Sequence, residues 1–186
     1  MILYINSCVR DESRTDRLAR VLLEKLEGEV KEIRLEDIDF PKTDAKFLFW
    51  RESCIASGDY SDELFSLAKD FAAADTIVIS APFWDLSFPA ALKQYFEHIN
   101  VLGLTFVYTP EGMPKGLCKA QKLYYVSTAG GPVFSMDFGF GYVRAMAQGY
   151  YGINDCEAIF AEGLDIQGAD IDTIMTDAEE RISRMF

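Results

Sequence analysis

The run Thr-Ile-Val-Ile-Ser at residues 76–80 constrains the fold most, because it is apolar and β-branched on both faces of a strand. A strand with two apolar faces suits the centre of a parallel sheet that helices cover on both sides. Short runs of similar character lie at residues 2–6, 122–127 and 157–163, and residues 29–35 alternate between polar and apolar like a further strand. The sequence therefore predicts five strands.

Amphipathic helical patterns separate these strands. The first begins with Ser13 or Thr15 as its N-cap and is expected to end at Gly28, and others start at Ser61 or occupy residues 88–101, 139–152 and 169–185. Residues 36–60 are expected to form an irregular excursion with a short helix, and residues 105–116 a small extended excursion with turns. Strands that alternate with helices imply a parallel sheet with right-handed crossovers. We predict one α/β domain over residues 1–186, a doubly wound five-stranded parallel sheet with helices on both faces.

Charge and composition exclude several classes of protein. The 186 residues carry a formal net charge of −12, which repels nucleic acid and anionic lipid. The chain contains no apolar run of about 18 residues, and its start lacks the basic segment and apolar run of a secretion signal. We therefore expect a cytoplasmic protein with no nucleic-acid partner and no membrane insertion.

The cysteine and histidine content predicts neither a metal site nor a disulfide framework. Cys8, Cys54, Cys118 and Cys156 are widely spaced, and His98 is the only imidazole in the chain. Reduced thiols are the simplest interpretation for a cytosolic protein. We expect His98 to be an exposed helix residue and not a catalyst.

Three loops at strand ends carry the candidate site, because ligands of such sheets bind outside the carboxyl ends of the strands. The first loop, residues 7–15, offers hydroxyls, backbone N–H groups and the positive end of a helix dipole, which together suit a phosphate. Arg14 can add a charge-assisted contact. The loop is neither a GxGxxG fingerprint nor a P-loop. An alternative interpretation is that this loop is only the capped start of a helix.

The other two loops suit a planar ring. Residues 81–87 contain Pro82, Phe83 and Trp84, which can form a flat apolar wall, although such residues also serve core packing. Residues 127–132 contain Gly130 and Gly131, which allow backbone N–H groups to approach a ligand closely. Each loop alone is a weak indication. Their joint occurrence at three strand ends favours a binding site.

Over its whole length the sequence resembles the flavodoxin-like FMN-dependent NADH-azoreductases and NAD(P)H:quinone reductases. Five segments carry the resemblance: SRT at 13–15, APFWDLSFPAALKQYFEHI at 81–99, GLTFVYTPEGMPKGL at 103–117, STAGG at 127–131 and IFAEG at 159–163. The second segment is the most specific. The resemblance implies a flavodoxin-like fold, FMN as cofactor, NADH or NADPH as electron donor, and a quinone or azo compound as acceptor.

The resemblance also implies roles for individual residues. The FMN phosphate would be held by Ser7, Ser13, Arg14 and Thr15. The isoalloxazine would lie along Pro82, Phe83, Trp84, Asp85 and Leu86, and its pyrimidine side would meet Ser127, Thr128, Ala129, Gly130 and Gly131. The chain departs from the family pattern in three places: Asp85 stands where asparagine is usual, Ala129 where arginine is common, and no histidine follows the glycines.

The family is homodimeric with its sites at the subunit interface, so the helix at 88–101 and the aromatic patch at 47–50 are the predicted contacts. The implied mechanism is a two-step (ping-pong) cycle in which NAD(P)H reduces FMN and leaves before a small aromatic acceptor enters. The chemistry belongs to the cofactor, with backbone N–H groups of Gly130 and Gly131 assisting and no side-chain nucleophile. Two alternatives stay open, a flavodoxin-like single-electron carrier and a cofactor-free interaction domain. The sequence decides neither the acceptor nor the choice between NADH and NADPH.

Overall fold

A computed structural model describes all residues, 1–186, and is built on a five-stranded parallel sheet. The strands are β1 (Ile2–Asn6), β2 (Val30–Arg34), β3 (Thr76–Ser80), β6 (Lys122–Thr128) and β7 (Asp155–Ala161), in the order β2-β1-β3-β6-β7. β3 is the central strand, as its two apolar faces predict. This is the flavodoxin-like strand order, so the predicted fold class is confirmed.

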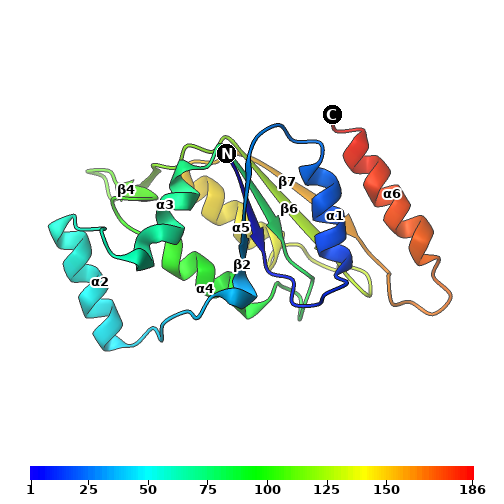
Figure 1. Ribbon diagram of the computed structural model, residues 1–186, viewed down its shortest axis with the longest axis horizontal. Coiled ribbons are helices and arrows are strands. Elements are labelled where there is room, and N and C mark those ends of the chain that lie inside the picture. Colours follow the sequence, from blue (N-terminus) through cyan, green and yellow to red (C-terminus); the bar gives the residue numbers. More distant parts are fainter.

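Helices cover both faces of the sheet (Figure 1). On one face lie α1 (Arg14–Leu23) and α6 (Ile171–Ser183), and on the other α3 (Ser66–Ala73), α4 (Ala90–Ile99) and α5 (Phe140–Met146). A π-helical turn, Ala147–Tyr151, continues α5, and 3-10 turns occupy Leu35–Asp37 and Glu63–Phe65. The expected extended excursion is an antiparallel hairpin of β4 (Phe106–Tyr108) and β5 (Pro114–Gly116).

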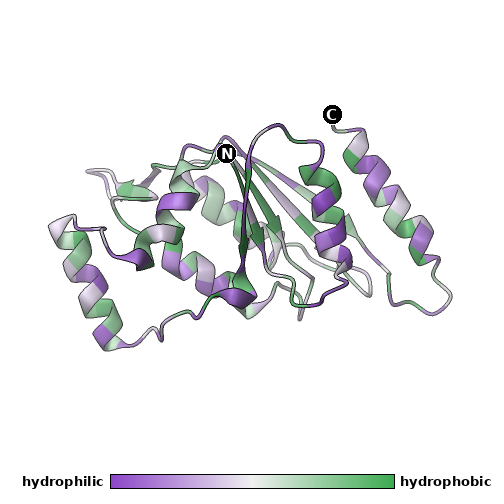
Figure 2. Cartoon of the chain, viewed as in Figure 1, coloured by the Kyte–Doolittle hydropathy of each residue, from purple (hydrophilic) through white to green (hydrophobic).

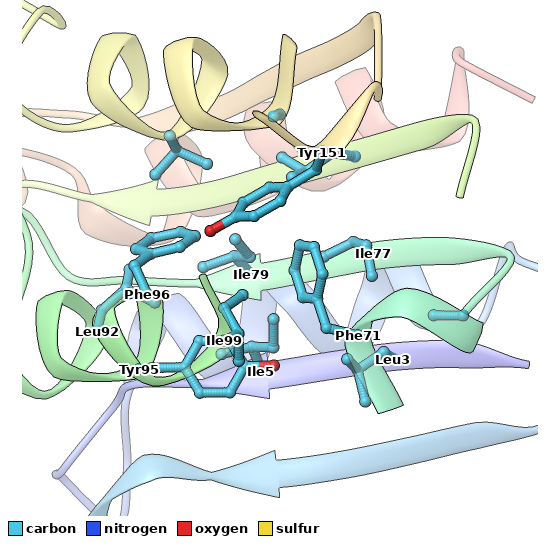
Figure 3. Packing of buried hydrophobic residues seen from close by; sticks show 14 of the residues in the cluster. Leu3, Ile5, Phe71, Ile77, Ile79, Leu92, Tyr95, Phe96, Ile99 and Tyr151 are labelled. Atoms are coloured by element: carbon cyan, nitrogen blue, oxygen red, sulfur yellow. The ribbon is translucent and has the colours of Figure 1, made fainter. Parts of the chain in front are cut away.

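The core consists of two apolar layers, one on each face of the sheet. Consecutive strand residues point to opposite faces, so Leu3 and Ile5 belong to one layer and Ile2 and Tyr4 to the other. Figure 2 shows the apolar strands enclosed by helices whose outer faces are hydrophilic. Figure 3 shows the larger layer, where strand side chains meet Phe71, Leu92, Tyr95, Phe96, Ile99 and Tyr151. These layers fix the strand ends that carry the candidate site.

The structure differs from the sequence prediction between residues 36 and 60. Instead of a short helix it contains α2 (Ala45–Ser57), capped by the Asp44 carboxylate, which accepts from the N–H of Phe47 at 3.0 Å, and ended by Gly58 with φ 68°. α2 lies beside the main body, at the left of Figure 1, and none of its residues is buried. It is held by contacts to other elements: Trp50 stacks on Phe65 at 5.8 Å, and Arg51 donates to backbone carbonyls at the end of α4.

Two further expectations were wrong. α1 ends at Leu23 and not at Gly28, because turn hydrogen bonds take over at Lys25 and Leu26. His98 is buried, with 5% of its surface exposed, because the rings of Phe40 and Phe47 lie over it at centroid distances of 5.0 and 5.6 Å. This cover comes from a distant segment, which helical periodicity does not reveal. No helix is both long enough and apolar enough to cross a bilayer.

Candidate functional site

A cavity of about 390 Å³ opens at the carboxyl ends of the parallel strands. Its volume lies in the range of small-molecule sites, about 300–1,000 Å³. All three predicted loops contribute to its wall, together with the loop that follows β7. The lining residues are Val9, Arg10, Glu12, Ser13, Arg14, Thr15, Pro82, Phe83, Trp84, Thr128, Ala129, Gly130, Leu164 and Asp165.

The first loop provides unpaired donors at the start of α1. Ser13 is the N-cap, as predicted, and its hydroxyl accepts from the N–H of Asp16 at 3.3 Å. The N–H groups of Arg14 and Thr15 have no partner in the chain. The Thr15 hydroxyl lies 2.6 Å from that of Thr128, which joins this loop to the end of β6. Free amides at the positive end of a helix dipole form an anion site.

Ser7 lies below the cavity and not in its wall. Its side chain is 2% exposed, and its hydroxyl donates to the Ser80 carbonyl of β3 at 2.7 Å. Beside it, Asn6 Oδ1 accepts from the N–H of Cys8 at 2.9 Å and from the Ser80 hydroxyl at 3.2 Å. These bonds hold the loop at the strand end. Burial also raises the pKa of the Cys8 thiol, which favours its neutral form.

The second loop forms a tight turn with an unusual backbone. Trp84 and Ser87 exchange two backbone hydrogen bonds of 3.1 and 2.8 Å. Between them Asp85 and Leu86 have φ values of 50° and 68°, a left-handed conformation that is costly for leucine. Pro82, Phe83 and Trp84 line the cavity, whereas Asp85 and Leu86 lie outside its wall.

The third loop presents two glycines with free N–H groups. The carbonyls of Gly130 and Gly131 accept from the N–H groups of Asp165 and Gly163 at 2.9 and 3.3 Å, but their own N–H groups have no partner. A Cβ on Gly131 would meet nothing within 4 Å, whereas one on Gly130 would lie 2.3 Å from Asp165 Oδ2. Thr128, Ala129 and Gly130 line the cavity; Ser127, fully buried, and Gly131 do not.

The loop after β7 is a part of the site that the sequence prediction missed. Leu164 and Asp165 line the cavity, and Asp165 Oδ1 accepts from Arg14 Nη1 at 3.1 Å. Arg14 and Asp165 are 151 positions apart in the chain, so no local pattern links them. The rule that located the other loops, polar residues directly after a parallel strand, applies here as well and could have found Asp165.

The cavity thus has one end rich in anion donors and one wall of proline and aromatic rings. With the strand order, this defines the class: an α/β protein of flavodoxin type that binds its ligand at the strand ends. The sequence profile of the family described as "Flavodoxin-like fold" matches residues 1–186. The chain belongs to this family, which confirms the predicted resemblance.

Two curated relatives are similar over almost the whole chain, and both are named FMN-dependent NADH:quinone oxidoreductase. The protein from Clostridium beijerinckii is 33% identical over 97% of this chain and 94% of its own length. Its counterpart from Clostridium acetobutylicum, number 2 of that name, is 35% identical over the same shares of the two chains.

Solved structures agree in fold. An azoreductase from Bacillus anthracis superposes with a TM-score of 0.83 at 24% identity, covering 99% of this chain and 97% of its own. An FMN-dependent NADH-azoreductase from the same species, solved in complex with FMN, gives a TM-score of 0.79 at 22% identity, covering 99% and 98%.

Proposed function

We propose that this protein is an FMN-dependent oxidoreductase that uses NADH or NADPH to reduce a quinone or azo compound in a two-step cycle. The names of its relatives support the reaction class. The observation that carries the proposal is the convergence of four strand-end loops on one cavity with free N–H groups at one end and an aromatic wall.

The residues present fit FMN. The phosphate matches the free N–H groups of Arg14 and Thr15, since charge-assisted bonds from amides at a helix start are strong. The flat ring matches the wall of Pro82, Phe83 and Trp84, and Trp84 is 39% exposed and available for contact. The open space at Gly131 leaves room for a ligand to approach the backbone.

When bound, FMN supplies the hydride chemistry. The residues of the chain would bind the cofactor and orient it. The unpaired N–H groups of Gly130 and Gly131 would stabilise negative charge at the pyrimidine side of the ring. The N–H groups of Asp85 and Leu86 are also unpaired, but both residues lie outside the cavity wall. Ser7 acts by holding the first loop on β3 and not by contact with the phosphate. His98 takes no part, because it is buried under Phe40 and Phe47 outside the cavity.

We further propose that the protein is a cytoplasmic homodimer. α2 has no buried residue, and two consecutive apolar residues on it, Leu48 and Phe49, are 42% and 76% exposed, so that a second copy can cover them. Light scattering of the wild type and of Phe49→Asp tests this. We expect a dimer that the substitution weakens, and a wild-type monomer contradicts the proposal.

A visible spectrum of the purified protein tests the reaction class. We expect flavin absorbance that bleaches anaerobically on addition of NADH or NADPH and returns when a quinone is added. A flavin that nicotinamide does not bleach indicates a single-electron carrier. Protein that binds no FMN on reconstitution indicates the cofactor-free interaction domain. Either result refutes the proposal.

A further inference from the structure

Asp165 lines the cavity, but the proposed function gives it no role. Its N–H donates to the Gly130 carbonyl at 2.9 Å, and its carboxylate accepts from Arg14 at 3.1 Å. One residue therefore joins the loops that follow β1, β6 and β7, which lie at the same end of the sheet, the lower end in Figure 1.

The absence of a side chain at residue 130 leaves room for the Asp165 carboxylate beside the backbone of the cavity wall. A Cβ there would lie 2.3 Å from Asp165 Oδ2 and 3.0 Å from Cγ, so Gly130 is what allows this approach. Both Asp165 and Arg14 line the cavity. A carboxylate thus occupies the guanidinium of Arg14, the residue whose N–H group begins the anion-binding end of the cavity.

The Arg14–Asp165 ion pair contributes little to the stability of the fold. The side chains are 41% and 72% exposed, and exposed pairs are screened by water. The contact matters for ligands. A phosphate dianion that approaches Arg14 must displace the carboxylate or share the guanidinium with it, and it is repelled by the like charge.

We infer that Asp165 is a built-in competitor for the phosphate group of the ligand, which occupies Arg14 in the free protein and weakens FMN binding. The inference rests on the proposed function. Removing the Asp165 charge frees Arg14 and removes the repulsion, so binding of a phosphate-bearing flavin tightens. The affinity for a flavin without a phosphate is expected to stay the same.

The test compares FMN with riboflavin, which lacks the phosphate. The apoprotein of the full chain is titrated with each at low ionic strength, and flavin fluorescence quenching gives the Kd. For Asp165→Asn we expect FMN to bind roughly three- to tenfold more tightly, riboflavin to bind as to the wild type, and the gain to shrink at high salt.

Asp155→Asn is the matched control. Asp155 is also an exposed aspartate in an ion pair, with Lys122 at 2.9 Å, but it begins β7 at the opposite end of the strand from the cavity. Asp155→Asn changes the net charge by the same amount as Asp165→Asn and is expected to leave the Kd values for FMN and for riboflavin unchanged. In an Arg14→Gln background the gain from Asp165→Asn is expected to shrink, because the contested guanidinium is absent.

The outcomes separate the inference from the proposed function. A wild type that binds FMN, with unchanged or weaker FMN binding by Asp165→Asn, overturns the inference alone and makes Asp165 an orienting partner of Arg14. Equal tightening of FMN and riboflavin also overturns it, since the phosphate is then not involved. A wild type that binds neither flavin overturns both.

Discussion

The substitution Gly131→Val separates ligand binding from folding. A Cβ at residue 131 meets nothing within 4 Å, and the φ of Gly131 lies outside the left-handed region. The fold therefore tolerates a side chain here, and we expect the free energy of unfolding to change by no more than about 0.5 kcal/mol.

Ligand binding, in contrast, is expected to suffer. Gly131 follows Gly130 of the cavity wall, and a valine there would extend into the open space beside it and keep the proposed ligand from the free N–H groups of both residues. The ring of oxidised FMN is uncharged, so each of the two hydrogen bonds contributes about 0.5–1.5 kcal/mol. Loss of both raises the Kd for FMN by a factor of roughly 5 to 160.

The assay is FMN titration of the apoprotein, with thermal unfolding measured alongside. Gly149→Val is the matched control, because a Cβ there also meets nothing within 4 Å, but Gly149 belongs to the π-helical turn Ala147–Tyr151 and not to one of the loops that form the cavity. The control is expected to bind FMN like the wild type. A Gly131→Val variant that folds and retains FMN with unchanged affinity refutes the reasoning.

Three further predictions follow from the geometry. Leu86→Asn relieves the left-handed backbone at φ 68° by about 1 kcal/mol, so the unliganded protein is expected to gain roughly 2–4 °C in Tm by calorimetry; a lower Tm contradicts this. His98→Phe is expected to leave quinone-dependent NADH oxidation unchanged, because the imidazole is buried outside the cavity, and a large loss of kcat in a folded variant contradicts this. Burial raises the pKa of the Cys118 thiol from 9.0 to about 12. Between those pH values the thiol loses its proton in the unfolded chain but keeps it in the folded one, so the free energy of unfolding falls as the pH rises. Denaturant titrations of Cys118→Ala are expected to show a flatter decline over that range than the wild type, and parallel declines contradict this.

The sequence predicts the sheet well because the strands are short and most of them are continuous apolar runs, so that their burial follows from local pattern. β3 coincides with the predicted residues 76–80, and β7 begins two residues before its predicted start. α2 was predicted only as a short helix within an irregular excursion, because it does not bury one continuous face; Trp50 and Arg51 hold it through residues distant in sequence.

The candidate site was predicted only in part, because the strand-end rule locates its loops but not the contacts between them. Ser13, Trp84 and Gly130 belong to loops that the strand-end rule identifies, and they line one cavity. Ser7 was placed in the wall although its hydroxyl bonds to β3, because the sequence does not show which way a side chain points. Asp165 depends on a contact across 151 positions, which only the fold brings together.

A crystal structure of the protein with FMN tests the central claim most directly. We expect the phosphate within hydrogen-bond distance, about 2.7–3.2 Å, of the amide nitrogens of Arg14 and Thr15, and the ring against Trp84. FMN density elsewhere on the molecule, or a cavity that closes on its own side chains in the presence of saturating FMN, contradicts the account.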